Sequence, residues 1–417
     1  MKKRNRPEKV PVPPKRRGRP PKDHSGGIIT QLPLNLGAAA DAQRWKDGQN
    51  RGTHLKGAAI ASPTVLTRHL SPAKVTPVYD SYWRFAAERQ NVFFNRIIGA
   101  ARPWTTNPVL ATYKFTNAYR ASDRVSQYLI RHVIYRDDLP ASEEEVFFRI
   151  LLFKLFNKIE TWVLLESELG PLTFSDFRFH RYDEVLARAM KRGQRVYSAA
   201  YIMPPGSSAF GHPAKHQNHL CLLERMMADE LPKKLTDAHS MQQGFELLRA
   251  YPTIGDFLAY QFVTDVNYSA ITNFSEMDFV VPGPGARDGL RKCFADPGGL
   301  NEPELIRLMA DIQEAEFERL EISFPSLWGR RLQLIDCQNL FCEVDKFARV
   351  AHPDIAGRTG RMRIKQKFSP TSTPLVFWYP PKWGLNDRIL SGALPNEIAV
   401  YEPDNGSVNR TPEARTG

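Results

Sequence analysis

Apolar residues recur at three- and four-residue intervals along most of this chain, which is the spacing of one face of an α-helix. The first dense pattern runs from Tyr79 through Phe93 to Ile98. Similar patterns follow to about Leu390 with short loops between them, and alternating stretches that would predict strands are scarce. We therefore predict a mostly α-helical domain over residues 77–390.

One segment, residues 143–169, is apolar on all sides and is predicted to form a central buried helix. The other helices are predicted at residues 121–135, 182–192, 219–230, 241–251 and 256–266, and within 305–320 and 334–347.

The two ends of the chain show neither the apolar spacing of a helix nor the alternation of a strand. Residues 1–76 are rich in Pro, Gly, Ala, Ser and charge, and residues 391–417 are polar with several prolines. Such segments bury too little apolar surface to offset the entropy lost on ordering. We predict a disordered N-terminal arm and a disordered C-terminal tail.

Charge is concentrated in the arm. The chain has a net charge of +12, and its first 24 residues contain ten Lys or Arg but only two acidic residues. The remaining chain holds 47 basic and 43 acidic residues. A basic arm is therefore joined to a nearly balanced body, and the arm favours a polyanionic partner.

Composition excludes several classes of protein. An apolar share of 42% supports a sizeable core, so the chain is neither wholly disordered nor fibrous. Four scattered cysteines are too few for a disulfide scaffold and favour a reducing compartment. Since no apolar run suits a membrane span or a signal peptide, we expect a protein that is not exported, nuclear in a eukaryote and otherwise cytoplasmic with the nucleoid.

Within the arm, residues 15–22 read Lys-Arg-Arg-Gly-Arg-Pro-Pro-Lys and resemble an AT-hook. Glycine lets such a backbone press into a narrow minor groove, and arginine side chains reach along its floor, where A·T tracts concentrate negative potential. A nuclear import signal or a solvated charge run is the alternative. The residues predicted to contact DNA are Arg16, Arg17, Gly18, Arg19 and Pro20.

A second DNA-binding candidate lies in the body, where Pro-Thr-Ile-Gly at 252–255 separates two predicted helices. This turn resembles the helix-hairpin-helix of DNA glycosylases, whose backbone N–H groups bind a DNA phosphate. Thr253 stands at the first hairpin glycine, whereas Ile254 and Gly255 match the pattern. Taken alone, the turn also fits an ordinary corner between two helices.

The segment after the hairpin supplies candidate catalytic residues. Glycosylases of this superfamily carry an aspartate about 20 residues beyond the hairpin, and Asp278 lies 23 positions after Gly255. A carboxylate there can stabilise positive charge on a sugar or orient a nucleophile. Phe257 replaces the lysine of bifunctional glycosylases, so lyase chemistry through a Schiff base is not expected. The candidate catalytic set is Asp278, Glu276, Arg287 and Asp288.

A narrower resemblance covers about residues 80–385. The blocks at 115–124, 155–162, 197–202 and 275–289 are similar to the helical domain named after 5-hydroxymethyluracil DNA kinases. That family is similar to the α-glutamyl/putrescinyl thymine pyrophosphorylases, which have a glycosylase-like fold. The resemblance implies a role in base hypermodification of double-stranded DNA, in which hydroxymethylated uracil is phosphorylated and the activated group is replaced by an amine or amino acid.

The kinase label itself lacks its usual motif. A P-loop needs Gly-x-x-x-x-Gly-Lys-Ser/Thr, and no such run exists in the sequence. If phosphorylation occurs, we expect a separate P-loop kinase to perform it. Residues 283–289 form a glycine-rich run that either binds an anion or positions the next helix.

No metal or cofactor is predicted. His212, His216 and His219 have spacing that could align three imidazoles on a helix, but no supporting carboxylate can be named. Lys215, which lies among them, is predicted to contact DNA phosphate. Cys337 and Cys342 lack the partners of an iron–sulfur cluster and are expected to be buried as small apolar residues.

Two polar groups keep two interpretations each. Arg120, Asp123 and Arg124 can share one helical face, where they either clamp a phosphate or brace neighbouring helices. The polar residues at 157–160 interrupt an apolar helix, so they form either an internal network or the lining of a site.

Three functions remain open at this stage. The first is an enzyme that extrudes a modified pyrimidine from duplex DNA and performs group transfer on it, with Asp278 as the central carboxylate. The second is a binding module without chemistry of its own that recognises modified DNA or delivers a kinase to it. The third is a monofunctional DNA glycosylase.

Overall fold

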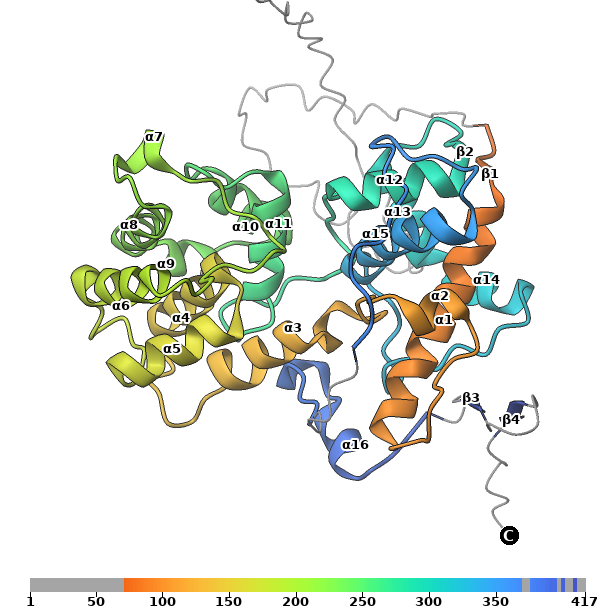
Figure 1. The fold of residues 1–417 in the computed structure, drawn as a ribbon, viewed down its shortest axis with the longest axis horizontal. Helices are drawn as coiled ribbons and strands as arrows, with labels where there is room; N and C mark the ends of the chain where they lie inside the picture. The colour runs from red at the N-terminus through yellow and green to blue at the C-terminus, as the bar shows by residue number, and fades with distance from the viewer. Residues whose placement is uncertain (1–70, 370–375, 396–398, 402–407, 411–417) are drawn as a thin grey trace, which may run out of the picture. The chain divides into compact units, whose positions relative to one another are not determined.

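The computed structural model describes residues 71–369, 376–395, 399–401 and 408–410. These residues form a mostly helical structure, which confirms the predicted fold class (Figure 1). The AT-hook-like residues and nearly all of the predicted arm lie outside the described residues. In the predicted tail, two three-residue strands pair antiparallel.

The elements follow one another in a fixed order along the chain. They are β1 (Lys74–Val75), α1 (Pro77–Ile97), α2 (Pro108–Thr112), η1 (Arg120–Ser122), α3 (Arg124–Leu129), η2 (Ile130–Ile134), α4 (Glu143–Phe156), α5 (Ile159–Leu169), α6 (Phe179–Lys191), α7 (Ser207–Phe210), α8 (Lys215–Ala228), α9 (Leu231–Thr236), α10 (Met241–Arg249), α11 (Asp256–Val266), α12 (Pro284–Cys293), β2 (Phe294–Asp296), α13 (Glu302–Asp311), α14 (Gln313–Arg319), α15 (Leu334–Ala351), η3 (Pro381–Trp383), α16 (Asn386–Leu390), β3 (Ala399–Tyr401) and β4 (Val408–Arg410).

Local sequence explains where the main helices begin. The Thr76 hydroxyl accepts a hydrogen bond from the N–H of Val78 at 3.1 Å, and Pro77 occupies the first helical position of α1. Ser142 caps α4 in the same way, and three glutamates fill the first turn of that helix. Their negative charges are favourable there because a helix N-terminus carries partial positive charge.

The helices form two groups (Figure 1). In one group α4 contacts α8, α9 and α11, and in the other α15 contacts α1, α12 and α13. The backbones of helices α12 and α15 are in direct contact at Gly289. A Cβ atom at this position would lie 2.0 Å from the carbonyl oxygen of Phe341, so only glycine fits there. One continuous cluster of buried apolar side chains runs through both groups.

The predicted central helix over 143–169 is wrong in its length. It breaks at Asn157, whose left-handed φ of 49° ends α4 and redirects the chain into α5. The Nζ of Lys154 donates to the Asn157 side-chain oxygen at 2.7 Å, which holds this left-handed conformation in place. Almost every residue of α4 is buried, whereas α5 buries few.

Other predicted helices also differ at their boundaries. The segment 121–135 holds the short α3 followed by the π-helical turn η2, and the pattern within 305–320 divides into α13 and α14. Helix α8 begins at Lys215, two residues after Pro213, which is earlier than predicted. In each case apolar spacing located the helix but left its ends open.

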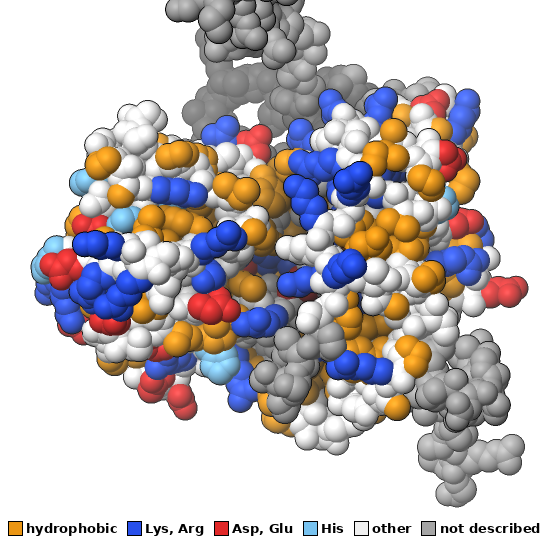
Figure 2. All heavy atoms as spheres, in the orientation of Figure 1, with side chains coloured by type: hydrophobic (Ala, Val, Ile, Leu, Met, Phe, Trp, Pro, Cys, Tyr) orange, Lys and Arg blue, Asp and Glu red, His pale blue; other side chains and the backbone are white. Residues whose placement is uncertain are grey.

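The described residues contain no helix that is both long and apolar enough to cross a membrane. All four cysteines are free. On the face shown in Figure 2, Lys and Arg side chains gather over the part of the molecule that carries α12 and α15.

Candidate functional site

The predicted hairpin is a tight turn between α10 and α11. Ile254 is 2% exposed and its N–H donates to the carbonyl oxygen of Tyr251 at 3.2 Å. Thr253 has a φ of 71°, the left-handed conformation that a glycine would adopt without strain. Gly255 precedes α11 in an extended conformation, and no side chain caps the N-terminus of that helix.

Helix α8 lies beside this hairpin. A Cβ atom on Gly206 would lie 3.3 Å from the methyl group of Thr253 and 3.2 Å from the Cβ of Asn218 in α8. Lys215, in the first turn of α8, places its Nζ 4.3 Å from the ring centroid of Tyr197. Partial burial lowers the pKa of Lys215. The two predicted DNA contacts in the body therefore belong to neighbouring elements.

Asp278 lies in the loop between α11 and α12 with an exposed side chain. Its backbone carbonyl oxygen accepts a hydrogen bond from Arg307 at 2.7 Å. No Lys or Arg among the described residues forms an ion pair with its carboxylate; the nearby Arg330 pairs with the buried Glu276 at 2.8 Å and stacks on the ring of Trp383. The loop is thus held by its backbone while the carboxylate faces solvent.

The other two candidate catalytic residues have partners elsewhere. Arg287 pairs with Glu302 at 3.1 Å. Asp288 is 1% exposed and accepts hydrogen bonds from the N–H and the hydroxyl of Thr359. The structure therefore does not bring the side chains of Asp278, Glu276, Arg287 and Asp288 together into one cluster.

A buried ionic cluster that was not predicted joins the two helix groups. The guanidinium of Arg120 donates to Asp265 at 2.9 Å and to Gln261 at 3.0 Å, both on α11, and the N–H of Arg120 donates to Asp336 on α15 at 2.8 Å. Lys154 on α4 places its Nζ 3.1 Å from the second oxygen of Asp265. We call Arg120, Lys154 and Asp265 the ionic cluster.

The ionic cluster lies in an environment that disfavours charge. Asp265 is fully buried, and burial lowers the pKa of Lys154 to about 8 although Asp265 opposes the shift. Aromatic rings complete the surroundings. The ring of Tyr201 lies 4.5 Å from Lys154 Nζ and stacks on Phe257 of α11, with ring planes 9° apart. The partly exposed Tyr201 and Phe257 thus connect the ionic cluster to the first turn after the hairpin.

The polar residues for which the sequence left two interpretations open divide into a buried set and an exposed set in the structure. Arg120 and Asn157 belong to the buried network, whereas Arg124 and Glu160 form an exposed pair at 3.5 Å. The sequence signal of the cluster is a charge inside an otherwise apolar helical stretch, at Lys154 and at Asp265. Any such charge must find a partner when its helix is buried.

The three histidines face different partners. His216 contacts Asp183 at 2.7 Å, His219 contacts the Tyr197 hydroxyl at 2.8 Å, and His212 lies 3.4 Å from Cys221. Burial lowers the pKa of His219 to about 4, so this imidazole is neutral. No group of metal-ligating side chains is present among the described residues.

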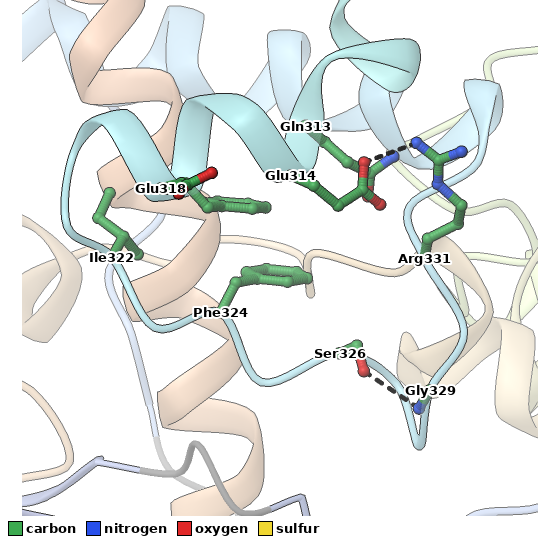
Figure 3. Close-up of a pocket in the computed structure, with 9 residues that line it drawn as sticks. Gln313, Glu314, Glu318, Ile322, Phe324, Ser326, Gly329 and Arg331 are labelled. Atoms are coloured by element: carbon green, nitrogen blue, oxygen red, sulfur yellow. Dashed lines mark hydrogen bonds and ion pairs between the residues drawn. The ribbon is translucent and has the colours of Figure 1, made fainter.

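A pocket of about 450 Å³ opens beside α14, and none of the predicted site residues lines it (Figure 3). Its apolar wall consists of Phe317 and Phe324, whose rings stack with centroids 4.4 Å apart. Glu314 and Arg331 form an ion pair at its rim at 2.8 Å. The remaining lining residues are Gln313, Glu318, Ile322, Ser326 and Gly329.

Comparison with known proteins gives one family and one relative. The family model described as "5-hmdU DNA kinase, helical domain" matches residues 76–357. A protein named 5-hmdU DNA kinase, from Bacillus phage SP10, is 27% identical over 288 residues, which cover 65% of this chain and 45% of the phage protein. The chain thus matches less than half the length of that relative. No solved structure matches.

Proposed function

This chain belongs to the family of the 5-hmdU DNA kinase helical domain, and from that membership we propose that it acts in the modification of 5-hydroxymethyluracil in DNA. The observation that carries the proposal is the family match over residues 76–357, because this range includes the hairpin, the Asp278 loop and the ionic cluster. Family membership alone leaves the chemistry of the chain open.

We propose further that the chain performs group transfer on an extruded pyrimidine. The hairpin and Lys215 hold the DNA backbone, and the base is extruded from the stack, as in other enzymes that perform chemistry on a single base. An amine nitrogen attacks that carbon, the bond from carbon to the phosphate oxygen breaks, and phosphate leaves. A carboxylate at Asp278 accepts the proton that the amine loses.

The geometry supports Asp278 in this role. Its side chain is exposed in a loop whose backbone is held by Arg307, so the carboxylate is accessible without being engaged in an ion pair among the described residues. Glu276 acts through Arg330, which fixes the same loop. Arg287 and Asp288 lie on α12, which follows the loop, and are proposed to position rather than to react.

The test is nucleoside mass spectrometry after incubation of the full chain with duplex DNA containing 5-hydroxymethyluracil or its phosphorylated form, together with a mixture of amines and amino acids. Asp278→Asn is expected to abolish formation of the altered nucleoside while DNA affinity stays within about twofold, because the side chain acts on the base and not on the phosphates. Asp237→Asn, at another exposed aspartate, is the matched control. Full turnover by the Asp278 variant would remove the mechanism.

A second candidate is a reader that delivers a separate P-loop DNA kinase to modified DNA. The observation that favours it is the coverage of the relative: more than half of the phage protein named a kinase lies outside the match, and this chain has no P-loop lysine motif. The same mass spectrometry distinguishes the candidates. A reader leaves the nucleosides unchanged, and a monofunctional glycosylase releases a free base.

A further inference from the structure

A row of cations follows α15 on the surface of the molecule. Between residues 355 and 369 the chain contains no Asp or Glu. The segment has no regular helix or strand. Its cations are Arg358, Arg361, Arg363, Lys365 and Lys367, and we call residues 358–367 the basic strip.

The backbone of the basic strip is fixed to the fold at its beginning. The buried carboxylate of Asp288 accepts hydrogen bonds from both the N–H and the hydroxyl of Thr359. Gly357 passes so close that a Cβ atom there would lie 3.1 Å from the carboxyl carbon of Asp288. Asp288, a candidate catalytic residue from the sequence, therefore holds the strip in place.

The middle and the end of the strip are fixed as well. The guanidinium of Arg349 on α15 donates to the carbonyl oxygen of Arg363 at 3.1 Å. Next to α2, the N–H of Lys114 donates to the carbonyl oxygen of Gln366 at 3.0 Å, and the N–H of Phe368 donates to the carbonyl oxygen of Thr112 at 2.9 Å. These bonds form an antiparallel bridge at Lys367. The cations thus project from a backbone with a defined path.

The side chains of the strip face solvent. Arg361, Arg363, Lys365 and Lys367 are exposed, and none forms an ion pair with an acidic residue in the part of the chain that the structure describes. Among the described residues, Arg358 is the one strip cation that reaches a carboxylate, that of Glu302 at 3.6 Å. From 361 to 367 the cations occupy every second position, a spacing of about 7 Å where the backbone is extended.

Apolar groups accompany the cations. Met362 is 51% exposed and Phe368 is 37% exposed, while Ile364 packs against the core. Figure 2 shows Lys and Arg side chains gathered over the part of the molecule with α12 and α15, the two helices that carry Asp288 and Arg349. A fixed row of unpaired cations with exposed apolar side chains suits a linear polyanion whose sugars and bases also offer apolar surface.

We propose that the basic strip binds the phosphodiester backbone of DNA. The proposal rests on the proposed function for its choice of DNA as the polyanion. It adds a contact surface on the α12 and α15 side, separate from the hairpin between α10 and α11. Each phosphate neutralised by the strip releases condensed counterions, so the strip makes affinity depend on salt without reading the base sequence.

The experiment measures the dissociation constant of the full chain for an unmodified duplex at several salt concentrations. The strip variant carries Arg361→Gln, Arg363→Gln, Lys365→Gln and Lys367→Gln. The control variant removes the same charge from exposed positions at and after α6, through Arg181→Gln, Lys191→Gln, Arg192→Gln and Arg195→Gln. Circular dichroism checks that both variants keep the helical content of the parent.

The strip variant is expected to lose at least about tenfold in affinity near physiological salt. The slope of log affinity against log salt should fall by about two to four, since each phosphate contact contributes about 0.9. The control should keep the parental slope within about one. Equal slopes for parent and strip variant, or an equal fall in the control, would overturn the proposal.

A third variant tests how the strip is held. Asp288→Ala removes the acceptor of both Thr359 hydrogen bonds and should lower the slope part of the way toward that of the strip variant. An unchanged slope in this variant would show that the bonds to Thr359 do not position the cations. Because the duplex is unmodified, failure of the proposed function would appear separately, as equal affinity of the parent chain for modified and unmodified DNA.

Discussion

At the scale of single residues, the ionic cluster is the most consequential feature. Asp265 is the anion between Arg120 and Lys154, and all three side chains are almost fully buried. Removing one partner of a buried ion pair leaves an uncompensated charge in an apolar environment, which is far more costly than losing an exposed pair.

Asp265→Asn is therefore expected to lower the free energy of unfolding by about 3–5 kcal/mol. The measurement is chemical denaturation followed by circular dichroism. Asp256→Asn is the control, because Asp256 lies on α11 like Asp265 but forms an exposed ion pair, with Arg249 of α10. This variant should cost less than about 1 kcal/mol. A loss below about 1 kcal/mol for the Asp265 variant would contradict the account of the cluster.

The buried Lys154 is expected to make the stability of the fold depend on pH. Burial lowers its pKa from the ordinary 10.5 to about 8, so between these values the unfolded chain binds a proton that the folded chain has released. Stability due to this residue therefore rises with pH across that window, by up to about 1.4 kcal/mol per pH unit. Relative to Lys154→Met, the parent should gain stability from pH 8 to pH 10, whereas a constant difference would mean that Lys154 stays charged throughout.

At the scale of elements, the turn between α10 and α11 is predicted to contact a DNA phosphate, and its backbone is strained at Thr253. Thr253 stands where the hairpin that this turn resembles has a glycine, and its φ of 71° is positive. Among the described residues, no group forms a hydrogen bond with its buried hydroxyl oxygen.

Thr253→Gly should raise the free energy of unfolding by about 1 kcal/mol, because glycine adopts this conformation without a Cβ penalty. Thermal unfolding provides the measurement. Thr253→Ala is the matched control, since alanine keeps the Cβ atom and should give no gain. Equal melting temperatures for the glycine and alanine variants would show that the turn is not strained at this position.

The positions of the helices could be predicted from the sequence better than the side-chain contacts between them. Apolar spacing located most helices, and the Pro-Thr-Ile-Gly run located the turn between α10 and α11, because both depend on residues close together in the chain. The break at Asn157 was missed, since the side chain that favours it belongs to a buried lysine whose partner, Asp265, lies over a hundred positions away. The candidate catalytic residues are close together in sequence, but three of them have separate partners in the structure.

At the scale of the whole molecule, charge is divided between the arm and the basic strip. The first 24 residues hold ten Lys or Arg, and the strip adds five cations without an acidic neighbour in sequence. If both segments contact one DNA molecule, as we propose, they raise the local DNA concentration seen by the body.

Deleting residues 1–24 should weaken binding to duplex DNA and flatten its salt dependence while any preference for the modified base is retained. The reason is that the predicted arm contacts are with phosphates and the minor groove, whereas the substituent on C5 of the modified base projects into the major groove. Titrations at several salt concentrations with modified and unmodified duplexes provide the measurement. Loss of base preference on deletion would show that the arm contributes to recognition of the base itself.

The central claim is that the chain acts on 5-hydroxymethyluracil in DNA, and equilibrium binding tests it most directly. The full chain is titrated with three duplexes that are identical except for one position, which carries thymine, 5-hydroxymethyluracil or the phosphorylated form. We expect one of the two modified duplexes to bind at least about fivefold more tightly than the thymine duplex, since one specific base contact discriminates by about 1–3 kcal/mol. Equal affinity for all three duplexes would contradict the claim.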